Sequence, residues 1–241
     1  VLCLLRYGSR AQLEALAELA GKEEGFDDKA LTVEARKRLQ RVLEKAYDAG
    51  NVTKEEVFDG VLALGKAYRW MDQCDESKAC YKKAKKGFVR LFGEDSVKAI
   101  NAAYMIACQL PTDDEIIVEF RRLWEMANVS LPEEAVTYAI ANSLGGKLWE
   151  KGKYREAKVF WLATLEGRRM VLGDEHKDTH ASMNNLGFLF MNMEDYEGAL
   201  DYFQQVLGVQ EKVLGIQHPK TLNTLYNLAI TSHFVLRDSA K

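Results

Sequence analysis

Apolar residues recur along most of the chain three or four residues apart, which is the spacing of one face of a helix. The clearest stretch contains Met183, Leu186 and Phe190, and a second one begins at Ala199 after a short turn at residues 194–196. The sequence shows no alternation of apolar and polar residues long enough to suggest a strand. The pattern therefore predicts an all-α protein in which antiparallel helices follow one another in pairs.

The helical pattern repeats with a shift of 42 residues. Residues 172–179 and 214–221 carry Leu, Gly, His and Thr at matching places, and the same shift brings Leu144 onto Leu186 and Leu228. A repeat of this length is typical of solenoids, in which each helix pair is stable only against its neighbours. We therefore expect an α-solenoid of antiparallel helix pairs.

Small residues take one fixed place in the repeat. Gly145, Gly187 and Ala229 are related by the same shift of 42 residues, and each lies in the middle of a predicted first helix. A small side chain lets the backbone of a neighbouring helix come close. We expect these three residues to set the close approach of the paired helices.

The repeats divide the sequence into two predicted parts. Residues 1–50 are expected to form irregular N-terminal helices or a cap, and residues 51–241 a repeat array. The predicted units of the array span about residues 57–93, 99–129, 137–173, 179–215 and, incomplete, 221–241. The last unit has a first helix without a partner helix, and such an end exposes apolar surface. We expect further repeats in the natural protein, or a second copy of the chain, to cover it.

Composition argues against several classes of function. Of the 241 residues, 47% are apolar and only three are proline, which suits long helices around a real core. The formal net charge of −3 gives no general attraction to nucleic acid.

The apolar run at residues 1–5 is too short to cross a bilayer, so no membrane partner is expected. Four cysteines form no C-x-x-C pair and are expected to be free thiols in a reducing, cytoplasmic setting: Cys3, Cys74, Cys80 and Cys108.

Two motifs suggest chemistry, but neither has the context that the chemistry needs. Residues 60–66 fit the phosphate-loop pattern G-x-x-x-x-G-K, yet Ala67 follows instead of Ser or Thr, and the segment lies within a predicted helix. His176 and His180 have the spacing of two metal ligands on a helix, but no third and fourth ligand is evident. Because His176 recurs as His218, it is interpreted as closing the turn between helices. We predict no enzyme, no metal site and no cofactor.

The repeat resembles a known family. The order small residue, Tyr, Ala and aromatic within residues 187–203 resembles the tetratricopeptide signature. The 42-residue period and the linker L-G-x-x-H-P-x-T at residues 214–221 resemble the kinesin light chain type, with Lys177 replacing the proline in the preceding linker. The resemblance is strong over residues 137–235. It implies a right-handed tetratricopeptide superhelix that serves as a scaffold for protein binding.

The resemblance implies two versions of that function. In the first, the scaffold binds a partner peptide in a concave groove, as in kinesin light chain-like binding of cargo or an adaptor. In the second, the chain is a regulatory or oligomerisation arm of a larger multidomain protein, for example one with a nucleotide switch. The groove version implies an extended peptide, with an acidic peptide as one candidate.

The resemblance also implies which residues line the groove. In the family, Asn just before the small-residue position hydrogen-bonds the peptide backbone, since an amide both donates and accepts. Asn185 and Asn227 have this place, and a solvated polar face or a hydrogen bond between helices is the alternative. One turn beyond the small residues lie Trp149, Met191 and His233. The complete set of groove candidates is Asn142, Ser143, Asn184, Asn185, Tyr226, Asn227, Lys66 and Arg69.

Basic residues crowd one predicted second helix. They are Lys78, Lys82, Lys83, Lys85, Lys86 and Arg90. Such runs are usually solvated surface, and that interpretation is favoured. The other interpretation is that this basic patch steers an acidic peptide toward the repeats.

Overall fold

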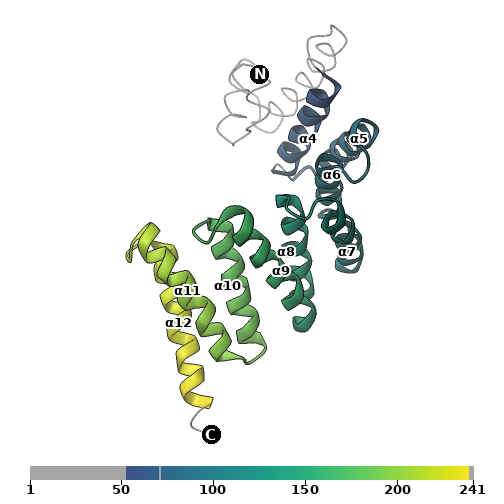
Figure 1. The fold of residues 1–241 in the computed structure, drawn as a ribbon. Helices are drawn as coiled ribbons and strands as arrows, with labels where there is room; N and C mark the ends of the chain where they lie inside the picture. Colours follow the sequence, from purple (N-terminus) through teal and green to yellow (C-terminus); the bar gives the residue numbers. More distant parts are fainter. Residues whose placement is uncertain (1–52, 71, 239–241) are drawn as a thin grey trace, which may run out of the picture. The chain divides into compact units, whose positions relative to one another are not determined.

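The computed structural model describes residues 53–70 and 72–238, which form nine helices and no strand (Figure 1). In chain order the helices are α4 (Lys54–Trp70), α5 (Cys74–Phe92), α6 (Val97–Ala107), α7 (Asp113–Ser130), α8 (Ala135–Glu150), α9 (Tyr154–Leu172), α10 (Lys177–Asn192), α11 (Tyr196–Leu214) and α12 (Pro219–Asp238). The prediction of an all-α fold is confirmed. The predicted cap, residues 1–50, lies outside the described residues.

The chain divides into two compact units, residues 1–111 and residues 112–241. In the described part of the first unit, α5 packs against both α4 and α6. In the second unit, each helix from α7 to α12 packs against the next one along the chain. Packing between successive helices is the arrangement expected of a solenoid. The division falls inside the predicted repeat 99–129, and the predicted repeat boundaries themselves stay a prediction.

Helix ends in the second unit follow from the linker sequence. Gly173 and Gly215 directly follow α9 and α11 with φ of 84°, in the left-handed region where glycine is favoured. Thr179 Oγ1 then donates a hydrogen bond to the carbonyl of Gly173 over 2.8 Å, and Thr221 Oγ1 does the same to Gly215 over 2.9 Å. The repeated Leu-Gly and Thr of the sequence thus end one helix and fix the start of the next.

Histidine completes the same linker. The Nδ1 atom of His176 accepts a hydrogen bond from the backbone N–H of Asp178 over 3.2 Å, and His218 accepts one from Lys220 over 3.2 Å. A side chain that accepts from the first turn of a helix satisfies a backbone donor that has no partner within the helix. The interpretation of these histidines as turn-closing residues is confirmed.

The small residues of the first helices lie against aromatic rings of the second helices. A Cβ atom added to Gly65 would be 2.6 Å from the Tyr81 ring. A Cβ atom added to Gly145 would be 2.5 Å from the Trp161 ring, and one added to Gly187 would be 2.5 Å from the Phe203 ring. The expected close approach of paired helices is therefore confirmed for Gly145 and Gly187, and it also occurs at Gly65.

Candidate functional site

The predicted groove residues fall on four first helices. Lys66 and Arg69 are exposed on α4, which belongs to the first unit. The other six lie in the second unit, where α8, α10 and α12 carry two each: Asn142, Ser143, Asn184, Asn185, Tyr226 and Asn227. The geometry of a site can therefore be built from the second unit alone.

The structure brings two of these residues into contact. The side-chain N–H of Asn185 donates a hydrogen bond to Oδ1 of Asn142 over 3.2 Å, linking α10 to α8. The backbone carbonyl of Asn142 accepts a second bond from Nε1 of Trp161 over 3.0 Å, which ties α8 to α9. Both asparagines are half-buried, and an amide can form up to four hydrogen bonds. The hydrogen bond between helices, one of the two alternatives for Asn185, is thus present, and it uses only part of the capacity of each side chain.

Asn227 differs from Asn185 although it has the same place in the repeat. Its exposed fraction is only 9%, and its backbone carbonyl accepts a hydrogen bond from Thr231 Oγ1 over 2.7 Å. The neighbouring Tyr226 is 64% exposed. On α12, Tyr226 is therefore far more accessible to a ligand than Asn227.

Two residues that sequence reasoning missed complete the exposed side of α8 and α10. No heavy atom lies within 4 Å of the position that a Cβ of Gly146 would take, so the surface there is open. One repeat later Phe188 has the same place, and its exposed ring packs edge-on against Phe203 with centroids 5.4 Å apart. The shift of 42 residues could have found both. We call Asn142, Ser143, Gly146, Asn185 and Phe188 the first-helix face.

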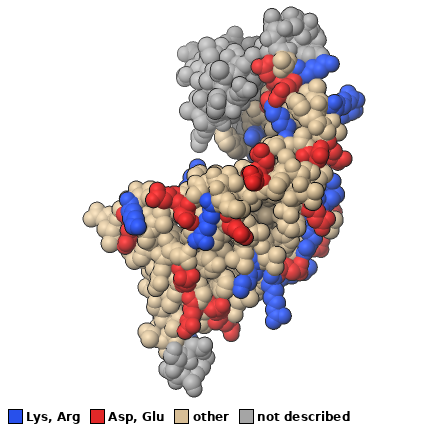
Figure 2. All heavy atoms as spheres, in the orientation of Figure 1, with Lys and Arg blue, Asp and Glu red and all other residues tan. Residues whose placement is uncertain are grey.

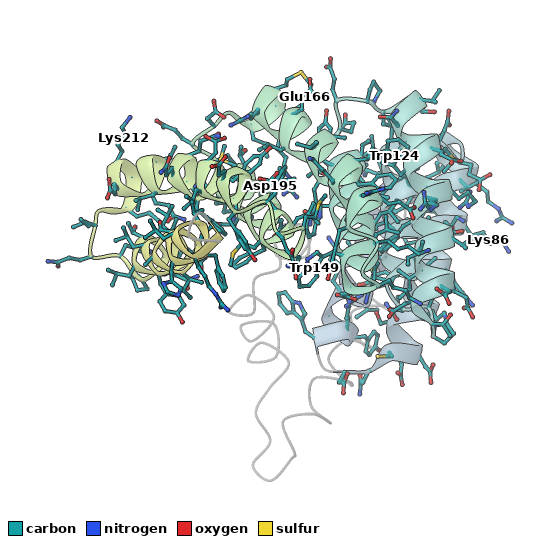
Figure 3. All side chains as sticks on the ribbon, turned by 90° about the horizontal axis from the view of Figure 1, so that it is seen from below. Lys86, Trp124, Trp149, Glu166, Asp195 and Lys212 are labelled. Carbon is teal, nitrogen blue, oxygen red and sulfur yellow. The ribbon has the colours of Figure 1, made fainter. Side chains whose placement is uncertain are left out.

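Three buried side-chain atoms among the residues described in the second unit have no hydrogen-bond partner. They are Nε1 of Trp149, which is a donor, Oδ1 of Asn184, which is an acceptor, and Nε2 of His180. Trp149 is half-buried on α8 (labelled in Figure 3), and its ring lies 6.5 Å from that of Trp161. Buried polar atoms without a hydrogen-bond partner are uncommon in folded proteins. Trp149 and Asn184, which lie on the same helices as the first-helix face, are therefore candidates for movement when a ligand binds.

Lys147 on α8 and Lys151, which directly follows this helix, form ion pairs within the second unit. Lys147 lies 2.8 Å from Glu150 and 3.0 Å from Asp113, and its hydrogen bonds to both carboxylates raise its pKa. Lys151 lies 2.6 Å from Asp114, and this hydrogen bond lowers the pKa of the Asp114 carboxyl. Figure 2 shows acidic and basic residues intermixed over the visible face. Lys147 and Lys151 thus have acidic partners beside them.

The basic patch lies on α5, in the first unit. Lys78 and Lys85 are half-buried there (Lys86 is labelled in Figure 3). The four exposed members are Lys82, Lys83, Lys86 and Arg90. Exposed lysines and arginines on one helix suit a solvated surface, and they also attract acidic ligands over about one Debye length, roughly 8–10 Å.

The apparent phosphate loop is a helix segment. Residues 60–66 lie entirely within α4, where the backbone N–H groups are committed to helix hydrogen bonds. Gly65 is buried against Tyr81, so the second glycine of the pattern serves helix packing. The arrangement does not offer the free amides that would hold a phosphate.

The titratable side chains of the described residues form neither a metal-binding cluster nor an activated thiol. In residues 53–70 and 72–238, no group of three His, Cys, Asp or Glu residues could hold a metal ion. Burial lowers the pKa of His180 and raises the pKa of the Cys80 and Cys108 thiols. A raised thiol pKa leaves little thiolate at neutral pH, so these cysteines are poor nucleophiles. Cys74, Cys80 and Cys108 are free thiols as expected, and Cys3 lies outside the described residues.

No helix in the described part of the chain combines the length and the apolar character needed to cross a membrane.

The family models that match this chain match residues of the second unit. The sequence model of a family described as "Tetratricopeptide repeat" matches residues 178–235, and a second model with the same description matches residues 137–178. No curated protein sequence matches the chain.

Solved structures share the fold at low sequence identity. The chain is similar to nearly identical TPR-like repeats from Podosopora anserina, provisionally assigned to a kinesin light chain, with 16% identity and a TM-score of 0.65. That match covers 78% of this chain and 90% of the other, and a single-substitution variant of the same repeats matches with the same identity and TM-score. The chain is also similar to BtubC (BKLC) from P. vanneervenii, with 17% identity, a TM-score of 0.70, and coverage of 92% and 84%.

Proposed function

Because residues 137–235 make this chain a tetratricopeptide repeat protein, we propose that it is a non-catalytic scaffold that binds an extended peptide of a partner protein. Tetratricopeptide repeats generally mediate protein–protein interaction, so the class of function follows from the family. The proposal goes further in assigning the peptide to the first-helix face of α8 and α10. There the peptide backbone pairs with Asn142 and Asn185.

One observation carries this assignment: Gly146 lies one helical turn after Asn142 on α8, so its open space is on the same side of the helix as the Asn142–Asn185 hydrogen bond. An extended peptide offers alternating N–H and C=O groups, and the two linked amides have unused donors and acceptors for them. Gly146 leaves room for the chain to approach the helix, and the exposed ring of Phe188 offers an apolar contact for a peptide side chain. Polar and apolar contacts thus lie side by side, as a peptide requires.

The unpaired atoms of Asn184 and Trp149 support ligand-linked rearrangement next to this face. A buried polar atom without a partner costs about 1–3 kcal/mol. If the amide of Asn184 turns outward to meet a peptide N–H, that cost is removed on binding. The same holds for Nε1 of Trp149 and a peptide carbonyl.

The sequence of the peptide is the finer part of the proposal. An acidic peptide is the candidate from the sequence: Lys66 and Arg69 on α4 and the basic patch on α5 favour acidic residues at the first unit, because opposite charges speed and orient the encounter. Kinesin light chain-like binding of cargo or an adaptor is the specific form of this function. Its support is the 42-residue linker pattern and the likeness in fold to the Podosopora anserina repeats.

The experiment selects peptides from a random display library on the whole chain and measures their affinity by fluorescence anisotropy. Gly146→Phe fills the open space with the side chain that Phe188 already places one repeat later, so the helix should tolerate it. Gly208→Phe is the matched control, because Gly208 is exposed on α11 and its Cβ position is also open. We expect Gly146→Phe to weaken binding at least about tenfold, or about 1.4 kcal/mol.

Equal binding by Gly146→Phe and the wild type would show that the peptides bind elsewhere. Loss with Gly208→Phe alone would move the site to the second helices. A series from low to moderate salt tests the acidic preference separately, since attraction between exposed charges weakens with ionic strength.

An arm that joins chains within a larger assembly is the second candidate function. The observation that favours it is a set of exposed apolar side chains on α12, with Leu222, Tyr226 and Leu236 between 53% and 71% exposed.

A further inference from the structure

The first-helix face of the second unit carries no charged side chain. On α8, residues 135–146 include no Lys, Arg, Asp or Glu, and on α10 the same holds for residues 179–192. The side chains in this part of α10 that are not buried are Ala181, Asn184, Asn185, Phe188, Met191 and Asn192. By contrast, the second helix α9 exposes ionised residues such as Glu166 (labelled in Figure 3) and Arg169. A ligand at the first-helix face therefore meets amides and rings rather than ions.

The charges that follow this face at the end of α8 include an excess of acid. Lys147, next to Gly146, lies 3.0 Å from Asp113 and 2.8 Å from Glu150. Lys151 is paired with Asp114 in the same way. Two lysines against three carboxylates leave one net negative charge. An acidic side chain of a peptide would gain no attraction there.

A lysine that reaches α10 lies on another side of that helix. The Nζ atom of Lys158, from α9, lies 4.3 Å from the centre of the Phe190 ring. Phe190 is buried and lies two residues from Phe188, and residues two apart on a helix do not share a face. Lys158 thus belongs to the packing of α9 on α10 and offers no charge at Phe188.

We propose that the peptide segment bound at the first-helix face is uncharged and places a large apolar side chain against Phe188. This inference rests on the proposed function and narrows the class of peptide. Gly146 and Phe188 lie one turn beyond the bonded Asn142 and Asn185, so the open space of α8 and the exposed ring of α10 are side by side. An apolar side chain that fills this space is removed from water together with the ring.

A charged side chain in the same place is disfavoured for a physical reason. It would give up hydration, and neither an amide nor a ring replaces that hydration as an opposite charge would. Acidic residues of the peptide that meet α4 and α5 therefore belong to a different segment from the one at the first-helix face.

The experiment uses the whole chain and the selected peptides whose affinity Gly146→Phe weakens. Each peptide position is replaced in turn by Ala, Glu and Lys, and affinity is measured by fluorescence anisotropy. We expect one apolar position at which Ala weakens binding about tenfold and both Glu and Lys weaken it further. Equal sensitivity to the two charges is expected because loss of hydration acts on either sign.

Phe188→Lys then tests where this apolar side chain lies. The introduced ammonium should meet the carboxylate of the Glu-substituted peptide and improve its affinity at least about tenfold over the wild-type chain. Val159→Lys is the matched control, because Val159 is 61% exposed on α9 of the same unit, and it should leave both affinities unchanged. Phe188→Met keeps an apolar contact and should bind the original peptide within about threefold of the wild type.

Circular dichroism melting checks that Phe188→Lys is folded. Gly146→Lys repeats the exchange at a position whose Cβ site is open, so the test does not depend on one variant.

Peptides that Gly146→Phe weakens, but whose essential residue at this face is Asp or Glu, overturn the uncharged segment and leave the proposed function intact. A Glu-substituted peptide that binds neither lysine variant better than the wild type overturns the placement against Phe188. If Gly146→Phe weakens none of the selected peptides, the proposed function fails, and this inference fails with it.

Discussion

Replacing Gly187 with alanine tests the packing that sets the distance between paired helices. The added Cβ would lie 2.5, 2.7 and 2.9 Å from three carbons of the Phe203 ring, closer than side-chain atoms approach in folded proteins. Phe203 is completely buried, so its ring has no solvent to move into. Either α10 and α11 separate or the ring leaves its preferred rotamer. Both responses destabilise the repeat.

The expected size follows from two opposing effects. Overpacking of a well-packed core costs about 1–3 kcal/mol. Alanine is favoured over glycine within a helix by about 1 kcal/mol. The net effect of Gly187→Ala is therefore a loss of up to about 2 kcal/mol. At about 2–4 °C per kcal/mol for a protein of this size, the melting temperature should fall by up to about 8 °C.

Thermal melting followed by circular dichroism measures this shift, with Gly208→Ala as the control. Gly208 lies on α11 of the same helix pair, but nothing stands within 4 Å of its Cβ position. Only the helix preference of alanine acts there, so the melting temperature should rise by about 2–4 °C. A Phe203→Leu substitution should then cost less in the Gly187→Ala background than in the wild type, because leucine relieves the clash.

Two results would refute the reasoning. Gly187→Ala could raise the melting temperature as much as Gly208→Ala does, which would mean that α10 and α11 are not in close contact at Gly187. Alternatively, the effects of Gly187→Ala and Phe203→Leu could simply add, which would mean that the lost stability does not come from the contact between these residues.

Two further predictions concern Thr179, which bonds to the linker, and the buried His180 of α10. Thr179→Val removes the hydrogen bond to the Gly173 carbonyl and should lower the free energy of unfolding by about 1–2 kcal/mol in urea titrations, whereas Thr179→Ser should retain most of it. Burial depresses the pKa of His180, so its stabilising effect is complete above the ordinary value of 6.5 and is lost as the pH falls below that value toward the folded-state pKa. Between pH 7.5 and about 5.5, the free energy of unfolding should therefore fall less in His180→Leu than in the wild type, as measured by parallel urea titrations. Equal losses in the two proteins would contradict a depressed pKa of His180.

The repeat could be predicted from sequence because its determinants are local. Gly173 ends a helix through its own backbone conformation, and Thr179 and His176 close the turn within six residues of it. Glycine at 145 and 187 likewise marks close helix approach by the absence of a side chain. Such signals recur with the 42-residue period and need no knowledge of distant contacts.

The candidate site was harder to predict because exposure depends on neighbouring helices. Asn185 and Asn227 share one place in the repeat, yet Asn227 is nearly covered while Asn185 reaches Asn142 on α8. Around α12, Thr231 Oγ1 contacts the sulfur of Met191 over 3.5 Å, a contact between residues 40 positions apart in the chain. The repeat pattern gives Asn185 and Asn227 the same position. It carries no information about the neighbouring helices that cover one side chain and not the other.

Ion pairs across the repeats illustrate the same limit. Lys98 on α6 lies 2.6 Å from Glu55 and 2.5 Å from Asp59 on α4. Partial burial alone would lower the pKa of Lys98, but its hydrogen bonds to the two carboxylates raise it overall. Nothing in the spacing of 39 and 43 residues indicates this pairing, because it depends on how α4 and α6 lie in the first unit.

Photo-crosslinking at position 188 tests the central claim most directly. A benzophenone amino acid, close to phenylalanine in shape, replaces the exposed Phe188 in one variant and Gly208 in another, and a peptide selected on the wild type is irradiated with each. Peptide binding at the first-helix face predicts a covalent adduct with the position 188 variant only, located by mass spectrometry. An adduct at position 208, with none at position 188, would contradict the assignment and place the peptide on the second helices.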